Sequence, residues 1–182
     1  MLEREKAAAM VREAVAAPQI VKHMLAAEAA MRAVARRLGE DEDVWGLTGL
    51  LHDLDYERTK DEPGRHGSAT VEMLAAYDVP AESLDAILAH NGHVAPATPL
   101  ARALLAVDPA TGFIVAATLM HPARKLAACD VTFLMKRFGE KRFAAGASRE
   151  QMATCAAFGL TVEEFLGVCR DGMAGAAEVL GL

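Results

Sequence analysis

The chain has 182 residues, of which 53% are hydrophobic and 24% are charged, and its formal net charge is −6. This composition excludes an intrinsically disordered chain, which carries less apolar surface and more net charge. The acidic balance also argues against a protein that coats nucleic acid, because such proteins are usually basic. We therefore expect one compact domain over residues 1–182, large enough to bury a real core.

Apolar periodicity and local helix signals predict three helices in the first part of the chain. The first is expected over about residues 2–16. The second is expected over 18–38, with proline in its first turn and glycine directly after its end. The acidic run at 41–43 favours the start of a third helix, which carries apolar side chains toward His52. Residues 56–65 are polar, contain proline and glycine, and are expected to form a loop.

Helical periodicity continues through the rest of the chain. Helices are expected over about 66–76 and 80–91, followed by an apolar stretch over 100–120 that Asp108-Pro109 interrupts. Shorter helices follow, two of them with capping-box sequences that begin at Ser148 and Thr161. No segment shows the sustained alternation of a strand, so the fold class expected is all-α.

Three features suggest a cytoplasmic protein that does not enter a membrane. The charged N-terminus, residues 1–10, does not resemble a secretory signal. The longest apolar run, residues 114–120, is much shorter than the roughly 20 residues that span a bilayer. The three cysteines form no CxxC pair, as expected of small buried thiols in a reducing compartment.

Ionisable residues lie where burial is expected. Asp53 follows His52 near the carboxyl end of a helix, which is the negative end of the helix dipole. Asp108 lies between two apolar runs, and His23 lies on the apolar face of the second predicted helix. An unpaired buried carboxylate costs several kcal/mol or more, so a cation is expected beside each aspartate. One divalent metal ion would account for all of these placements.

The order of these residues resembles a known signature. A lone histidine in VKHMLAAEAAMRA is followed by HDLD at residues 52–55, by histidines in PGRHGSA and LAHNGH, and by a lone aspartate in LLAVDPATG. This order is similar to that of the HD-domain superfamily of metal-dependent phosphohydrolases, in its stand-alone form. The resemblance covers about residues 21–111 and implies a metal-site core over about 18–122, with C-terminal helices over about 123–182 packing on it.

The resemblance also implies a reaction and a set of ligands. The cofactor would be a divalent ion (Mn, Zn, Co, Ni, Fe or Mg), and the metal ligands would be His23, His52, Asp53 and Asp108. His66 and His90 would bind a second metal ion or act on the substrate, so Asp53, His66 and His90 are the catalytic candidates. A metal-activated water would attack a small phosphate ester, expected to be a nucleotide. No nucleic acid polymer is expected as a partner.

Several of these residues have an ordinary structural interpretation. Asp108 can be a helix N-cap with proline at the first helical position, and His23 can be a hydrogen-bonded core histidine. His66 can simply begin its helix. Asp55 is either a loop carboxylate or a partner that orients a ligand histidine. A basic cluster can contact phosphate or form a solvated helix face, and it comprises Lys136, Arg137, Lys141 and Arg142.

Two other functions remain open. Some HD-fold proteins are similar to this sequence but use a di-iron centre to oxidise a substrate carbon, and the six candidate ligands would suffice for such an oxygenase. The other alternative is a non-catalytic module that binds metal or nucleotide. The five phenylalanines between residues 133 and 165 can pack on the core or form a dimer face, so the oligomeric state stays undecided.

Overall fold

The computed structural model describes all 182 residues, as helices joined by short loops and without strands. The all-α prediction is confirmed. In chain order the elements are α1 (Arg4–Ala14), α2 (Pro18–Leu38), α3 (Glu42–Leu51), α4 (Tyr56–Thr59), η1 (Pro63–Arg65), α5 (Ser68–Leu74), α6 (Ala81–His90), α7 (Pro99–Met120), η2 (Leu126–Ala128), α8 (Val131–Gly139), α9 (Arg149–Ala153), η3 (Thr154–Phe158), α10 (Val162–Ala174) and α11 (Ala177–Leu180).

Local capping residues define several helix ends. The Asp41 side chain accepts hydrogen bonds from the amides of Asp43 and Val44 at the start of α3. Gly39 ends α2 with φ of 78°, a left-handed conformation that glycine adopts without strain. Thr161 and Glu164 form the complete reciprocal capping box expected at the start of α10. These signals lie within a few residues of the helix ends, so the sequence predicted them well.

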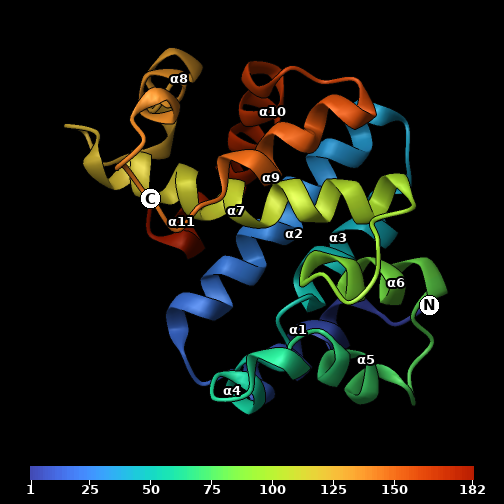
Figure 1. Ribbon diagram of the computed structural model, residues 1–182. Coiled ribbons are helices and arrows are strands. Elements are labelled where there is room, and N and C mark those ends of the chain that lie inside the picture. Colours follow the sequence, from blue (N-terminus) through green and yellow to red (C-terminus); the bar gives the residue numbers. More distant parts are fainter.

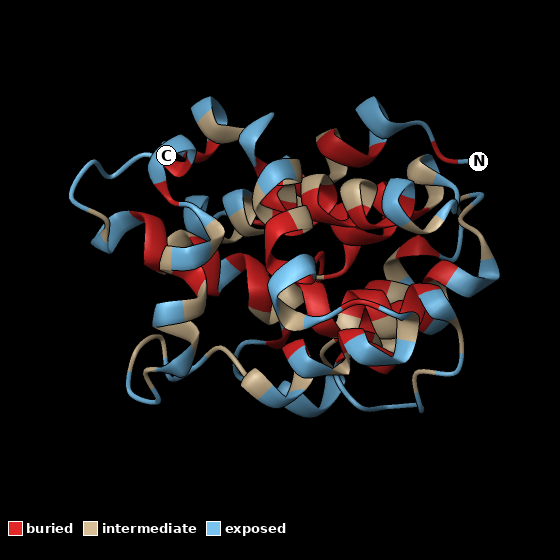
Figure 2. Ribbon diagram, turned by 90° about the horizontal axis from the view of Figure 1, so that it is seen from above, coloured by how far each residue is buried: buried red, intermediate tan, exposed pale blue.

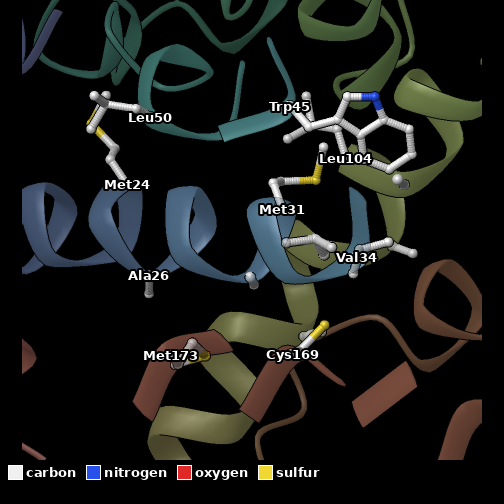
Figure 3. Close-up of a cluster of buried hydrophobic side chains, with 14 of the residues drawn as sticks. Met24, Ala26, Met31, Val34, Trp45, Leu50, Leu104, Cys169 and Met173 are labelled. Carbon is white, nitrogen blue, oxygen red and sulfur yellow. The ribbon is translucent and has the colours of Figure 1, made fainter. Parts of the chain in front are cut away.

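Helix α2 is buried on two sides. Met24 and Met31 point toward side chains of α3 and α7, including Leu50 and Leu104, and the opposite side of α2 lies against α10 (Figure 3). All of these side chains are fully buried. A single cluster contains 41 of the buried hydrophobic residues and extends from Leu2 to Leu180 in α11. Figure 2 shows this buried surface along the central helices and the exposed residues on the outer turns.

Helix α7 crosses the middle of the molecule, with α8, α9 and α10 on one side and α1 and α3 to α6 on the other (Figure 1). It is one continuous helix of 22 residues with Pro109 inside it. The predicted interruption at Asp108-Pro109 is therefore wrong, and Asp108 is not an N-cap. Burial of Leu104, Val107 and Phe113 on both sides of the proline favours continuing the helix despite the lost backbone hydrogen bond.

Length and composition alone would allow α7 to cross a membrane, but 56% of its most apolar window is buried inside the fold. The central helix of a helical bundle meets the same criteria. The segment 56–65 also differs from the expected loop, because it contains α4 and η1. The other predicted helix boundaries lie within two residues of the observed ones, and those of α2 coincide with them.

Candidate metal centre

The structure brings the six predicted site residues together from five parts of the chain. His23 lies in the second turn of α2, and His52-Asp53 directly follows α3. His66 follows η1, His90 is the last residue of α6, and Asp108 is in the middle of α7.

One group of ligand atoms lies between α2, the end of α3, and α7. The His23 Nε2 atom is 3.1 Å from the His52 Nε2 atom and 3.1 Å from Asp108 Oδ1. The candidate ligand atoms of these three residues lie within 4.8 Å of one another. Asp53 adds its carboxylate, with Oδ2 at 3.6 Å from His23 Nε2 and Oδ1 at 3.3 Å from His52 Nε2. These four residues can therefore hold one metal ion.

A second group adjoins the first through Asp53. The Asp53 Oδ1 atom is 3.2 Å from His66 Nε2 and 3.6 Å from His90 Nε2. The Nε2 atoms of His66 and His90 are 3.1 Å apart. The ligand atoms of His52, Asp53 and His90 also lie within 4.8 Å of one another. Asp53 thus contacts both groups, as a carboxylate between two ions would.

The hydrogen bonds on the far side of each imidazole direct all four Nε2 atoms into this centre. A histidine whose Nδ1–H donates a hydrogen bond keeps a lone pair on Nε2 for a metal ion. The Thr111 hydroxyl donates to the Asp108 carbonyl oxygen at 2.8 Å, so its oxygen can accept from an imidazole. The four Nδ1 partners are the Thr111 hydroxyl for His23 (3.0 Å), the Gly49 carbonyl for His52 (2.8 Å), the Asp55 carboxylate for His66 (2.8 Å) and the Ile87 carbonyl for His90.

This donor set fits a divalent cation. With the Nδ1 atoms protonated, four imidazole lone pairs and two carboxylates converge with no hydrogen-bond donor between them, and His52 is fully buried. Imidazole and carboxylate ligands without thiolate suit Zn, Mn, Fe, Co or Ni. Burial lowers the pKa of His52, but the carboxylates of Asp53 and Asp108 outweigh burial and raise it to about 9. Without a metal ion, the site therefore takes up protons in place of the missing positive charge.

Asp55 holds His66 and its loop in place. Its side chain is fully buried and accepts hydrogen bonds from His66 Nδ1 at 2.8 Å, from the Gly67 amide at 2.7 Å and from the Thr70 amide at 3.0 Å. Burial raises the pKa of Asp55, but these hydrogen bonds and the charge of His66 lower it below its ordinary value. Of the two interpretations of Asp55, the geometry favours the partner that orients a candidate ligand.

Sequence reasoning missed Thr111. It lies three residues after Asp108 on α7, a spacing that places both side chains on one face of the helix. The three-residue spacing from Asp108 was the one sequence signal for Thr111. It singles out Thr111 only when His23 is known to lie opposite α7.

The basic cluster lies outside the centre. Arg137 packs over the rings of Phe133 and Phe143 and pairs with Glu140 at 2.8 Å. Lys136, Lys141 and Arg142 are exposed, and none of them has a hydrogen bond or ion pair with a site residue. Lys136 and Arg137 lie on α8, and Lys141 and Arg142 lie in the turn that follows it, so the cluster is a partly packed, solvated surface.

An all-helical bundle in which histidines and aspartates converge at one centre is typical of helical metal-binding proteins. Comparison with known families identifies the class: the HD domain family matches residues 20–111, and the chain belongs to it. HD domains bind divalent metals and are typical of metal-dependent phosphohydrolases, so the recognition made from the signature residues is confirmed.

The curated relatives include several proteins named Ribonuclease Y. The protein from Acholeplasma laidlawii is 30% identical over 89 residues, which are 49% of this chain and 17% of the relative. The protein from Bacillus thuringiensis (strain Al Hakam) is 28% identical over 134 residues, which are 72% of this chain and 26% of the relative. The chain thus spans about a quarter or less of these relatives. No solved structure matches significantly.

Proposed function

We propose that this protein is a hydrolase of small phosphate esters, with nucleotides as its substrate class, and that His23, His52, Asp53 and Asp108 hold its metal ion. The observation that carries the proposal is the convergence of four Nε2 atoms on two carboxylates, while Nδ1 partners hold every imidazole in position. A divalent ion in such a site would polarise a phosphoryl oxygen and lower the pKa of its bound water to about 7.

The remaining residues act on the substrate or hold a second ion. Asp53 contacts both histidine groups and so sets their relative position. His66 and His90 present Nε2 at 3.2 and 3.6 Å from the Asp53 carboxylate. When they do not hold a second ion, these atoms can donate hydrogen bonds to phosphoryl oxygens or a proton to the leaving oxygen.

RNA is the competing substrate, because the curated relatives are named Ribonuclease Y. Two observations favour a small substrate. The formal charge of −6 repels a polyanion, and the exposed cations of the basic cluster do not contact the centre. A di-iron oxygenase would use the same six ligands, so the identity of the metal separates that alternative from hydrolysis.

The experiment that tests the proposal compares metal content and phosphate release in the wild type, His52→Ala and His121→Ala. His121 is a matched control, because it stacks against Phe133 outside the centre. Elemental analysis should find about one or two equivalents of metal in the wild type and in His121→Ala, but not in His52→Ala.

Phosphate release from adenosine and deoxyadenosine monophosphates should follow the metal content. If the protein shortens a single-stranded RNA but releases no phosphate from the monophosphates, RNA is the substrate. Iron as the main metal, together with oxygen consumption, would favour the oxygenase. Absence of metal from all three proteins, even after incubation with divalent ions, would refute the proposal.

A further inference from the structure

A pocket of about 200 Å³ opens beside the candidate metal centre, between α2, α7 and α11. His23 and Thr111 line it, and both belong to the centre as well. The His23 ring faces the pocket and also presents Nε2 to Asp108 at 3.1 Å. His23 is thus shared by the two sites: its Nε2 atom lies at the centre, and the residue also lines the pocket.

The pocket has an apolar wall and a polar rim. Ala26, Val115 and Leu180 supply carbon surface from three helices, and Ala26 and Leu180 are themselves buried. The polar groups are the Gln19 amide and the Lys22 ammonium, both on exposed residues of α2. Such a lining suits a carbon-rich group with a few hydrogen-bonding atoms.

Lys22 fixes the wall that α11 contributes. Its ammonium donates a hydrogen bond to the Leu180 carbonyl oxygen at 2.8 Å, which ties α11 to α2 across 158 residues of chain. This bond also satisfies a carbonyl near the end of α11, where helix carbonyls lack internal partners. The position of Leu180, and with it the depth of the pocket, depends on this contact.

Gly112 keeps the pocket open. It is an exposed residue within α7, and a Cβ atom added there would meet no atom within 4 Å. A glycine inside a helix costs about 0.5–1 kcal/mol relative to alanine, so helix stability does not explain its presence. The space beside it is pocket volume that a larger side chain would fill.

We propose that this pocket binds the organic group of the substrate while the phosphate lies at the metal centre. This inference rests on the proposed function and specifies its substrate: a phosphomonoester with one ring-sized, uncharged heterocyclic group. The volume of 200 Å³ is smaller than the roughly 300–1,000 Å³ of pockets for drug-sized ligands, so one ring fits and a dinucleotide does not. The Gln19 amide and the Lys22 ammonium can hydrogen-bond acceptor atoms of that ring.

The test measures binding of inorganic phosphate and of phosphonate analogues of adenosine and uridine 5′-monophosphate, whose P–C bond is not hydrolysed, to the metal-loaded protein by calorimetry. Inorganic phosphate reports on the centre alone, and the nucleotides report on the centre and the pocket. In the wild type at least one nucleotide should bind about ten- to a hundredfold more tightly than inorganic phosphate, the gain from burying one ring. Gly112→Leu should remove that advantage and retain phosphate binding, and Gly112→Ala should reduce it partly.

The matched control is Gly139→Leu, because Gly139 is also an exposed helical glycine beside which an added Cβ meets nothing, and it does not line the pocket. It should keep the nucleotide advantage. Equal binding of phosphate and both nucleotides by the wild type, or an unchanged advantage in Gly112→Leu, would overturn the assignment of the pocket. If inorganic phosphate itself does not bind, the proposed function fails, and the pocket assignment fails with it.

Discussion

Replacement of Gly49 by alanine should separate two helices that carry candidate ligands. Gly49 lies in α3 against the backbone of α2, and an added Cβ would lie 2.7 Å from the Ala27 carbonyl oxygen and 2.8 Å from its carbonyl carbon. These are backbone atoms, which cannot rotate away as a flexible side chain would. His52 follows three residues later and donates its Nδ1 hydrogen bond to the Gly49 carbonyl. The substitution therefore acts on both packing and the metal centre.

The size of the effect follows from the contact distances. Ordinary van der Waals contact begins at 3.4 Å, so α2 and α3 must move apart by about 0.7 Å at this point. Overpacking of this kind costs about 1–3 kcal/mol, and the better helix propensity of alanine returns at most about 1 kcal/mol. We expect a net loss of about 1 kcal/mol in the free energy of unfolding. A displacement of this size also exceeds the roughly 0.5 Å tolerance of a binding constellation, so metal affinity should fall as well.

Urea unfolding and metal titration of the same samples measure both effects. Gly112→Ala is the matched control for stability, because its added Cβ meets no atom and the helix propensity gain is the same. It should stabilise the protein by up to about 1 kcal/mol. Equal unfolding free energies for the two variants, or full metal affinity in Gly49→Ala, would refute the argument that close helix contact at Gly49 positions His52.

Three further outcomes are expected. Asp55→Asn removes the charged acceptor for His66 Nδ1 and should lower the affinity for a second ion, or the turnover rate, about 10–100-fold; unchanged values for both would leave Asp55 a purely structural role. Aspartate partners raise the pKa of His66 to about 10 and that of His52 to about 9, so metal uptake at pH 7 should release protons and metal affinity should rise with pH. Calorimetry in two buffers of different ionisation enthalpy measures the proton release, and its absence would contradict this prediction. Arg149→Met removes three hydrogen bonds to carbonyls of the 143–147 loop and should lower the unfolding free energy by about 2 kcal/mol, so an unchanged urea midpoint would count against it.

The helix ends that the sequence predicted best are those with local signals. Pro18, Gly39 and Asp41 act on backbone groups within a few residues of themselves, so their effect needs no knowledge of the tertiary fold. The error at Pro109 has the opposite origin. Proline weakens a helix locally, but the buried side chains before and after it favour a continuous α7, and that burial appears only in the packed structure.

The same distinction applies to the metal centre. The six candidate ligands could be predicted from the sequence because their identity and order along the chain resemble a family signature. The groups that orient these ligands were harder to predict from the sequence, because they depend on backbone geometry or on residues distant in the chain. The carbonyls of Gly49 and Ile87 each lie three residues before the histidine that they bond, so these contacts depend on the local turn of the backbone. The Thr111 hydroxyl and His23 are 88 residues apart in the chain, so their contact depends on the tertiary fold. The pocket needs α11 beside α2, and no local pattern predicts that contact.

The tie between Lys22 and Leu180 has an evolutionary consequence. The helices that carry the candidate ligands are packed on several sides, so most substitutions there disturb the core as well as the centre. Helix α11 is four residues long and supplies one wall of the pocket without contributing a candidate ligand. Mutations near Leu180 can therefore alter the proposed substrate pocket while the candidate metal ligands stay unchanged. Related proteins with the same ligands and a different last helix are expected to have diverged in substrate and retained the reaction.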